Sequence, residues 1–308
     1  MTSPGSAAAP LSSSRRDALI GIGLMLLGCL LYSANDALGK WLLVTYSVWQ
    51  MLLIRSVAAL ILMAPFIWHA GWAAFRDAPR PGLQILRIVL SSVEVVMFFV
   101  AVTHLPLADT VIFYLAGPIY VTALSALLLG EKVGWRRWSA VLVGFVGVVI
   151  ALRPSPATLT WPALIALTGS ISFAFLMITT RVVRGTPDIV LASGQIIATF
   201  VLGIVAAPFA WKPAPVGDTL QMALLGVVAV TALLCVNRSL KLAPASVVVP
   251  YQYTLLVWAT VFGYFVFGDV PTPHVIIGGI IIVAAGLFIF FREQRVASGN
   301  EPVTPPPT

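Results

Sequence analysis

Charged residues are scarce in this sequence. Only 9% of its 308 residues are Asp, Glu, Lys or Arg, whereas 59% are hydrophobic. A water-soluble domain carries about 25% charged residues, so this chain has too few to cover a soluble surface. Most of it must face lipid or pack inside a lipid-embedded bundle. The net charge of +7 resides in short loops between apolar runs, which excludes a continuous basic face for nucleic acid.

Cysteine and histidine are almost absent. The two cysteines, Cys29 and Cys235, both lie within apolar runs, and His69, His104 and His274 are widely separated. This excludes a disulfide framework and a Cys/His metal site. A Gly-rich phosphate loop is also lacking, which argues against an ATP-driven pump, and no cofactor is predicted. The first apolar run, 18–43, is too long for the apolar region of a signal peptide and predicts a first membrane span.

Long apolar runs are what the sequence has in abundance. A helix needs roughly 20 apolar residues to cross the hydrocarbon core of a bilayer. Runs bounded by charges, Pro and Gly predict an all-α protein with ten spans, near 18–42, 47–69, 83–104, 107–129, 136–152, 160–180, 187–210, 218–239, 245–267 and 274–291. The Ser-, Ala-, Pro- and Thr-rich ends, 1–14 and 296–308, are predicted to be disordered.

The distribution of Lys and Arg predicts the orientation of these spans. With the N-terminus inside, the inner segments hold every base except Lys40, Arg153 and Lys212, which are outside, and Arg55, which falls within a span. A missed span would invert all later loops, so this bias also supports the span count. Both termini are therefore predicted to be cytoplasmic.

Short motifs recur at a spacing of about 140 residues, which predicts two related halves, 15–153 and 154–295. Each half has five spans, an odd number, so the second half must enter the membrane from the opposite face. Secondary transporters with such inverted repeats bind substrate in a central cavity between the halves. The alternative is that apolar helices look alike by chance. The matching pairs are Ala64-Pro65-Phe66-Ile67-Trp68 with Ala207-Pro208-Phe209-Ala210-Trp211, Leu105-Pro106-Leu107-Ala108 with Leu242-Ala243-Pro244-Ala245, Leu129-Gly130-Glu131 with Phe267-Gly268-Asp269, and Lys40 with Arg181.

The first half resembles the C-terminal part of an EamA domain of the drug/metabolite transporter superfamily, and the second half resembles it more loosely. In the second half Gly268-Asp269 replaces Gly-Glu, and no Trp-Arg-x-Trp run follows. The resemblance implies a ten-helix exporter of amino acids, other metabolites or drugs in a bacterial cytoplasmic membrane, similar to amino-acid exporters that include aromatic amino-acid exporters. The motifs that carry it are Leu105-Pro106-Leu107-Ala108-Asp109, Pro118, Leu128-Leu129-Gly130-Glu131-Lys132-Val133-Gly134-Trp135-Arg136-Arg137-Trp138 and Gly144-Phe145-Val146-Gly147-Val148.

Three ionisable residues lie near the outer ends of the first two spans. Asp36 and Lys40 are four residues apart on one helix face, so they can pair directly. Arg55 lies about two turns into the second span, at a depth similar to Asp36. One interpretation is an ion-pair cluster that fixes the two spans in register, since buried charges require partners. The other is an outer gate or a docking point for a zwitterion.

Glu94 falls near the middle of the third span with no base nearby in the sequence, and Ser91 lies one turn below it. Charges at membrane depth are costly, so an isolated carboxyl group there can hold a proton, which proton coupling would use. The alternative is a protonated Glu that only forms a hydrogen bond between helices.

Aromatic residues supply the remaining candidates for substrate binding. Tyr114 and Tyr251 are equivalent under the repeat offset (251 − 114 = 137), and Tyr251 shares a helical stripe with Trp258. Their faces and polar tips would suit an amphipathic or aromatic substrate, although simple helix packing explains them equally well. Asn237 and Arg238, at the inner end of the eighth span, are candidates for a cytoplasmic gate.

Pro118 and Pro250 are predicted to interrupt spans four and nine. They are not aligned under the repeat, so no symmetric device is predicted from them.

These observations favour a secondary transporter that exports small metabolites, amino acids in particular, and is not an enzyme. A second hypothesis is an importer or exchanger of a nucleotide-like or cofactor-like solute, which several cavity-facing bases would favour. A third is a membrane-embedded enzyme or non-transport scaffold, for which a nucleophile–base or metal-ligand set at depth is lacking. The predicted partners are the bilayer, an amino-acid-like solute and protons, and a monomer is compatible with the sequence.

Overall fold

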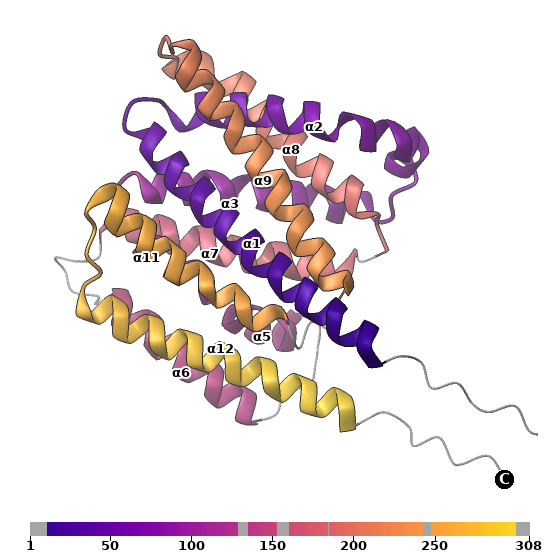
Figure 1. The fold of residues 1–308 in the computed structure, drawn as a ribbon, viewed down its shortest axis with the longest axis vertical. Helices are drawn as coiled ribbons and strands as arrows, with labels where there is room; N and C mark the ends of the chain where they lie inside the picture. Colours follow the sequence, from indigo (N-terminus) through magenta and orange to yellow (C-terminus); the bar gives the residue numbers. More distant parts are fainter. Residues whose placement is uncertain (1–10, 129–134, 153–159, 184, 243–247, 300–308) are drawn as a thin grey trace, which may run out of the picture.

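The computed structural model describes residues 11–128, 135–152, 160–183, 185–242 and 248–299 (Figure 1). Within these ranges every regular element is helical, as predicted. The elements are α1 (Leu11–Leu43), α2 (Val48–Arg76), α3 (Pro81–Val102), α4 (Leu107–Leu115), α5 (Gly117–Leu128), α6 (Trp135–Leu152), α7 (Trp161–Val182), α8 (Asp188–Ala206), the 3-10 turn η1 (Ala207–Ala210), α9 (Val216–Leu242), the 3-10 turn η2 (Val249–Tyr253), α11 (Thr254–Phe267) and α12 (Pro273–Gly299).

The helices have the length and surface of membrane spans. In the described residues α1, α2, α3, α7, α8 with η1, and α9 contain segments long and apolar enough to cross a bilayer, and shorter apolar segments run through α4–α5, α6 and α12. Large apolar side chains remain on the outside, such as Ile61 with 70% of its surface exposed. A contiguous apolar surface of this kind must contact lipid. Each predicted span thus corresponds to one helix or to a broken pair.

Several predictions concern residues at or beyond the described ranges. Helix α1 begins at Leu11 and α12 ends at Gly299, so 11–14 and 296–299 are helical although they were predicted to be disordered. The outer parts of both tails, the Gly-acid motif at 129–131, residues 243–245, Lys132 and Arg153 lie outside the described residues. The start of α1 and the end of α12 lie at the same end of the bundle (Figure 1).

The packing of the helices repeats between the two halves. Helix α1 packs on α9 as α3 packs on α7, and α2 packs on α9 as α3 packs on α8. Helices α1, α2 and α3 of the first half correspond to α7, α8 and α9 of the second half. Replacing each helix by its counterpart turns the α1–α9 contact into the α7–α3 contact, and the α2–α9 contact into the α8–α3 contact. The contacts of α2 with α8 and of α6 with α12 join equivalent helices, and the contact of α4 with α11 joins the equivalent spans four and nine. This pattern confirms the predicted arrangement of two related five-span halves.

Both broken spans restart at equivalent positions. Span four breaks at Ala116 between α4 and α5, and span nine changes from η2 to α11 at Thr254. Gly117 and Thr254, which begin α5 and α11, are related by the same offset as Tyr114 and Tyr251 (254 − 117 = 137). The two breaks are therefore symmetric, although no symmetric device was predicted from the prolines. The prolines are not aligned because each lies in the first turn of a different element, Pro118 in α5 and Pro250 in η2, where a missing N–H is tolerated.

The repeated Ala-Pro-Phe-x-Trp motif has a different backbone in each half. In the first half Pro65 lies inside α2, which continues to a kink at Gly71, where φ is 73° and the left-handed region favours glycine. In the second half the motif forms η1, and Trp211 is extended. The motif therefore ends span seven but does not end α2.

Candidate functional site

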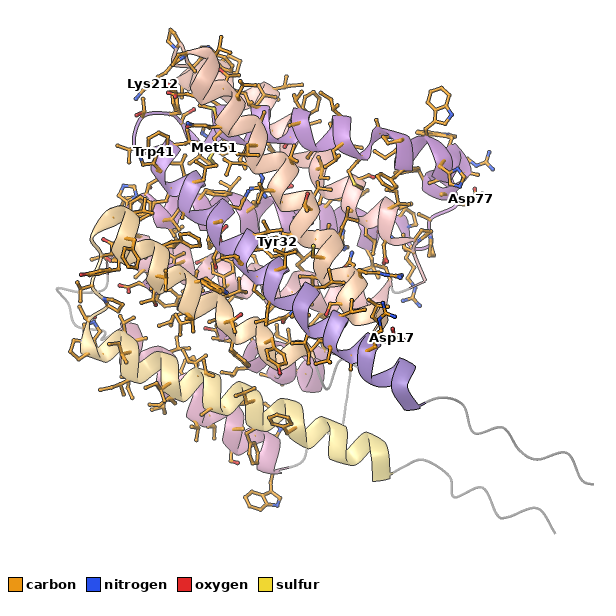
Figure 2. All side chains as sticks on the ribbon, viewed as in Figure 1. Asp17, Tyr32, Trp41, Met51, Asp77 and Lys212 are labelled. Atoms are coloured by element: carbon orange, nitrogen blue, oxygen red, sulfur yellow. The ribbon has the colours of Figure 1, made fainter. Side chains whose placement is uncertain are left out.

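A cavity of about 160 Å³ lies between the two halves, as predicted. Helices α1, α2 and α3 of the first half and α8 and α9 of the second half form its wall. The wall is mostly apolar and contains five polar residues, which are Tyr32, Arg55, Ser56, Gln195 and Thr199. Figure 2 shows Tyr32 on α1 near the middle of the molecule.

Three ionisable side chains gather at one depth beside this cavity. Asp36 lies seven residues before the end of α1, Arg55 seven residues after the start of α2, and Glu94 eight residues before the end of α3 (43 − 36, 55 − 48, 102 − 94). At 1.5 Å per residue they are about 10–12 Å from the ends of their helices. Arg55 interacts electrostatically with both carboxyl groups and with Tyr32. Glu94 is therefore not isolated, and the prediction that it has no base nearby holds only along the sequence.

The guanidinium of Arg55 keeps hydrogen-bonding capacity that these neighbours do not use. No ion pair within 4.0 Å joins Arg55 to Asp36 or Glu94, all three of which are described residues. Its Cζ lies 5.3 Å from the centroid of the Phe99 ring, a cation–π contact, and its Nη1 is buried without a hydrogen-bond partner. A buried donor without a partner is costly and marks a place where a ligand can supply the acceptor.

Lys40 does not pair with Asp36, so that prediction is wrong. Its Nζ donates to Asp269 Oδ2 at 2.9 Å and to the carbonyl oxygen of Leu105 at 3.1 Å, and it lies 4.6 Å from the centroid of the Phe267 ring. Asp269 belongs to the second half, in the loop after α11. Lys40 therefore joins the two halves at the end of the bundle rather than fixing α1 against α2.

Further polar contacts join the halves at this same end. Tyr46 donates to Asp218 Oδ2, and this hydrogen bond raises the pKa of Tyr46. Gln50 Nε2 donates to the carbonyl oxygen of Lys212 at 2.8 Å, and the Lys212 backbone N–H donates to Gln50 Oε1 at 3.0 Å. These contacts hold the two halves together at the end of the bundle at which Lys40 lies.

The predicted residues on spans three and four lie beside the cluster rather than in the cavity wall. The Tyr114 hydroxyl donates to the carbonyl oxygen of Glu94 at 3.2 Å, and its ring contacts Phe98 edge-on with centroids 5.2 Å apart. Ser91 is fully buried and donates to the carbonyl oxygen of Ile88 at 2.9 Å. The Ser91 hydroxyl therefore forms its hydrogen bond within its own helix, α3.

The remaining predicted residues lie elsewhere. Tyr251 and Trp258 pack together against Met25 and Cys29 of α1, and Trp258 Nε1 is buried without a hydrogen-bond partner. In the last two turns of α9, Asn237 is half-buried and Arg238 is exposed. The structure does not bring these four residues into the described cavity wall.

Polar residues of the second half were missed by the sequence analysis. The hydroxyls of Ser56 and Thr199 lie 3.0 Å apart and connect α2 to α8 beside the cavity. Gln195 lies one turn from Thr199 in the same wall. Polar side chains one turn apart in the apolar run 187–210 were the available signal. In the described residues no group of three or more His, Cys, Asp or Glu could hold a metal ion.

Residues 19–153 and 160–291 each match the EamA-like transporter family. The chain belongs to this family. It is similar to the S-adenosylmethionine uptake transporter of Rickettsia bellii, with 28% identity over 91% of this chain and 96% of the relative. It is also 26% identical to the riboflavin transporter of Rhizobium johnstonii, over 90% and 93% of the two chains, and 26% identical to the pseudopaline exporter CntI of Pseudomonas aeruginosa, over 86% and 94%.

A solved crystal structure shares the fold, with a TM-score of 0.56 and 18% identity over 92% of this chain and 99% of that chain. The EamA-like chain is accordingly a multi-pass membrane transporter of small molecules and not an enzyme. The names of its relatives include both uptake and export.

Proposed function

We propose that this transporter moves a small solute with an amino-acid head group, which carries an ammonium and a carboxylate, across the bacterial cytoplasmic membrane by alternating access. The observation that carries the proposal is Arg55 at the cavity wall. It retains an unpaired N–H donor and faces Asp36 and Glu94 without an ion pair to either. A guanidinium binds a carboxylate through charge-assisted hydrogen bonds, and the two acidic groups suit the ammonium.

The size of the cavity agrees with such a head group. Its volume of about 160 Å³ is close to that of an apolar cavity of ~150 Å³ that binds benzene. A small amino acid, or the head of a larger one, fills this space without rearrangement. A larger solute requires the halves to move apart, and Tyr114, Tyr251, Trp258 and Ser91 remain candidates for contacts with its side chain in the opened state.

Export of an amino acid, with both termini cytoplasmic, is the first candidate. In this orientation Lys40 and Asp269 close the outer end, and Asn237 and Arg238 lie at the inner end as gate candidates. The second candidate is uptake of a cofactor-like solute, which the S-adenosylmethionine uptake relatives favour. S-adenosylmethionine carries the same amino-acid head group, so both candidates share the role of Arg55. Riboflavin lacks that head group.

Transport by purified protein in liposomes tests this proposal, with methionine, phenylalanine, S-adenosylmethionine and riboflavin as solutes. We expect saturable transport of one or more solutes with the head group. We expect Arg55→Ala to reduce their apparent affinity by about a hundredfold, because the solute carboxylate loses its charged partner. Arg76→Ala is the matched control, since Arg76 pairs only with exposed Asp77 in the described structure.

Thermal unfolding of each variant separates a binding defect from a folding defect. Equal affinity in wild type and a folded Arg55→Ala variant would refute the role of Arg55. Transport of riboflavin alone would refute the proposed head group.

A further inference from the structure

The charges around the cavity do not balance. Arg55 contributes one positive charge, and Asp36 and Glu94 contribute two negative charges when both are ionised. The described wall from α8 and α9 adds only the neutral polar side chains of Gln195 and Thr199. With both carboxyl groups ionised the site has a net charge of −1, and one added proton makes it neutral. Unbalanced charge at membrane depth is costly, so an occupied site is most stable when its contents supply one positive charge.

We propose that the solute and any accompanying proton together bring one net positive charge into this site. A neutral zwitterion such as methionine then travels with one proton, which a carboxylate of Asp36 or Glu94 takes from the loading side and releases on the other side. A solute with an additional positive charge, such as the sulfonium of S-adenosylmethionine, travels without a proton. This inference rests on the proposed head group and names the charge of the solute that the site accepts.

The carboxyl groups of Asp36 and Glu94 can accept this proton, because no ion pair with Arg55 occupies them. Neither carboxyl group forms an ion pair within 4.0 Å to Arg55, and each retains an intermediate exposed fraction although it lies deep in the bundle. The titratable groups that face them are Tyr32 of α1, Arg55 of α2 and Tyr114 of α4, whose hydroxyl donates to the backbone of Glu94. No titratable residue of α8 or α9 lines the described cavity wall.

Lys40 and Asp269 do not alter this charge count. They form an ion pair with each other at the end of the bundle, 2.9 Å apart. The pair contributes no net charge. The balance at the cavity therefore depends on Asp36, Arg55 and Glu94.

The number of protons that enter with each solute tests the inference. Proteoliposomes with a pH-sensitive dye inside, and a membrane potential set by potassium and valinomycin, report protons and charge per solute. For wild type we expect one proton with each methionine and none with each S-adenosylmethionine, and one positive charge moved with either solute. Both values come from the wild-type protein, so they do not depend on the folding of a variant.

Glu94→Gln and Asp36→Asn each bring the charge of the site to zero. We expect both variants to move methionine without a proton and to lose about tenfold in apparent affinity for S-adenosylmethionine. Asp77→Asn, which changes an exposed carboxyl group outside the cavity, should retain the wild-type proton count and affinities.

The experiments distinguish a failure of the charge rule from a failure of the proposed function. Methionine transport by wild type without any proton would overturn the charge rule and leave the proposed head group standing. A wild-type proton count preserved in both neutralised variants would also overturn it. Absence of transport for every solute with the head group would instead reject the proposed function.

Discussion

At the residue scale, the spacing of the cavity wall depends on a missing side chain. Helix α9 meets α2 at Gly226, where an added Cβ would collide with the carbonyl oxygen of Arg55 and lie 3.0 Å from the backbone nitrogen of Ala59. Backbone atoms cannot rotate away from such a contact as side-chain atoms can. Small residues allow membrane helices to approach this closely. The absence of a side chain at Gly226 therefore allows α9 to pack directly against the backbone of Arg55 on α2.

Gly226→Ala should destabilise the protein and impair transport. We expect the free energy of unfolding to fall by about 1–3 kcal/mol, because the two helices must separate to admit the methyl group. Thermal unfolding in detergent measures this change. Gly23→Ala on α1 is the matched control, since nothing lies within 4 Å of its added Cβ, and its effect should stay within about 0.5 kcal/mol. Equal unfolding temperatures for the two variants would show that α9 does not constrain α2 at this point.

Single residues also show what the sequence could and could not predict about the site. Asp36, Arg55 and Glu94 were identified because ionisable groups at membrane depth are rare, a property visible in the sequence. Their partners were not predictable, because helical periodicity relates residues only within one helix. It suggested Asp36 as the partner of Lys40, whereas Asp269 is 229 residues away and arrives through the packing of α11 on α1.

At the scale of elements, the ion pair of Lys40 with Asp269 fixes the end of α1 to the loop after α11. The two side chains are 15% and 28% exposed, so solvent screens their attraction less than it screens that of Arg76 and Asp77, which are 70% and 62% exposed. Lys40 also holds the carbonyl oxygen of Leu105 at the end of span three. One ammonium thereby ties together the ends of three spans.

Asp269→Asn should loosen this end of the bundle. We expect a loss of about 1–2 kcal/mol in the free energy of unfolding, because Lys40 keeps its charge but loses its anionic partner in a partly buried setting. If the contact closes the cavity, a cysteine placed at Leu52 in the cavity wall should also react faster with a water-soluble maleimide. Asp77→Asn, in the exposed pair, should change neither quantity. An unchanged labelling rate in Asp269→Asn would show that the pair does not control access.

Element boundaries followed from the sequence where bilayer thickness sets them and failed where packing sets them. Ten apolar runs predicted ten spans because a helix that crosses lipid needs about 20 apolar residues. Pro118 predicted an interruption of span four but not its exact residue, because a proline in the first turn of a helix leaves the break before it. Ala116 is fully buried where α4 meets α5, and its position emerges only under the offset that relates Gly117 to Thr254.

At the scale of the whole molecule, alternating access requires the two halves to move against each other. Helix α1 of the first half packs along α9 of the second half, toward the end of the bundle at which α1 begins and α12 ends (Figure 1). A Cβ added at Gly28 would lie 3.5 Å from Cβ of Cys235 on α9. This separation falls within the range of about 3.5–4.5 Å found in disulfides. The native chain therefore already supplies one of the two thiols needed to link the halves.

Gly28→Cys should form a disulfide with Cys235 under mild oxidation and stop transport if the halves separate at this end. The side chain of Val236 must rotate, since its Cγ2 lies 2.7 Å from the added Cβ. Mass-tagging of free thiols should show three thiols in the reduced variant and one after oxidation, and a reductant should restore both thiols and transport. The double variant Gly28→Cys with Cys235→Ser should be insensitive to oxidation, which excludes a link through Cys29. Full transport by the oxidised, cross-linked protein would mean that α1 and α9 move as one body, and the moving boundary would then have to lie between other helices.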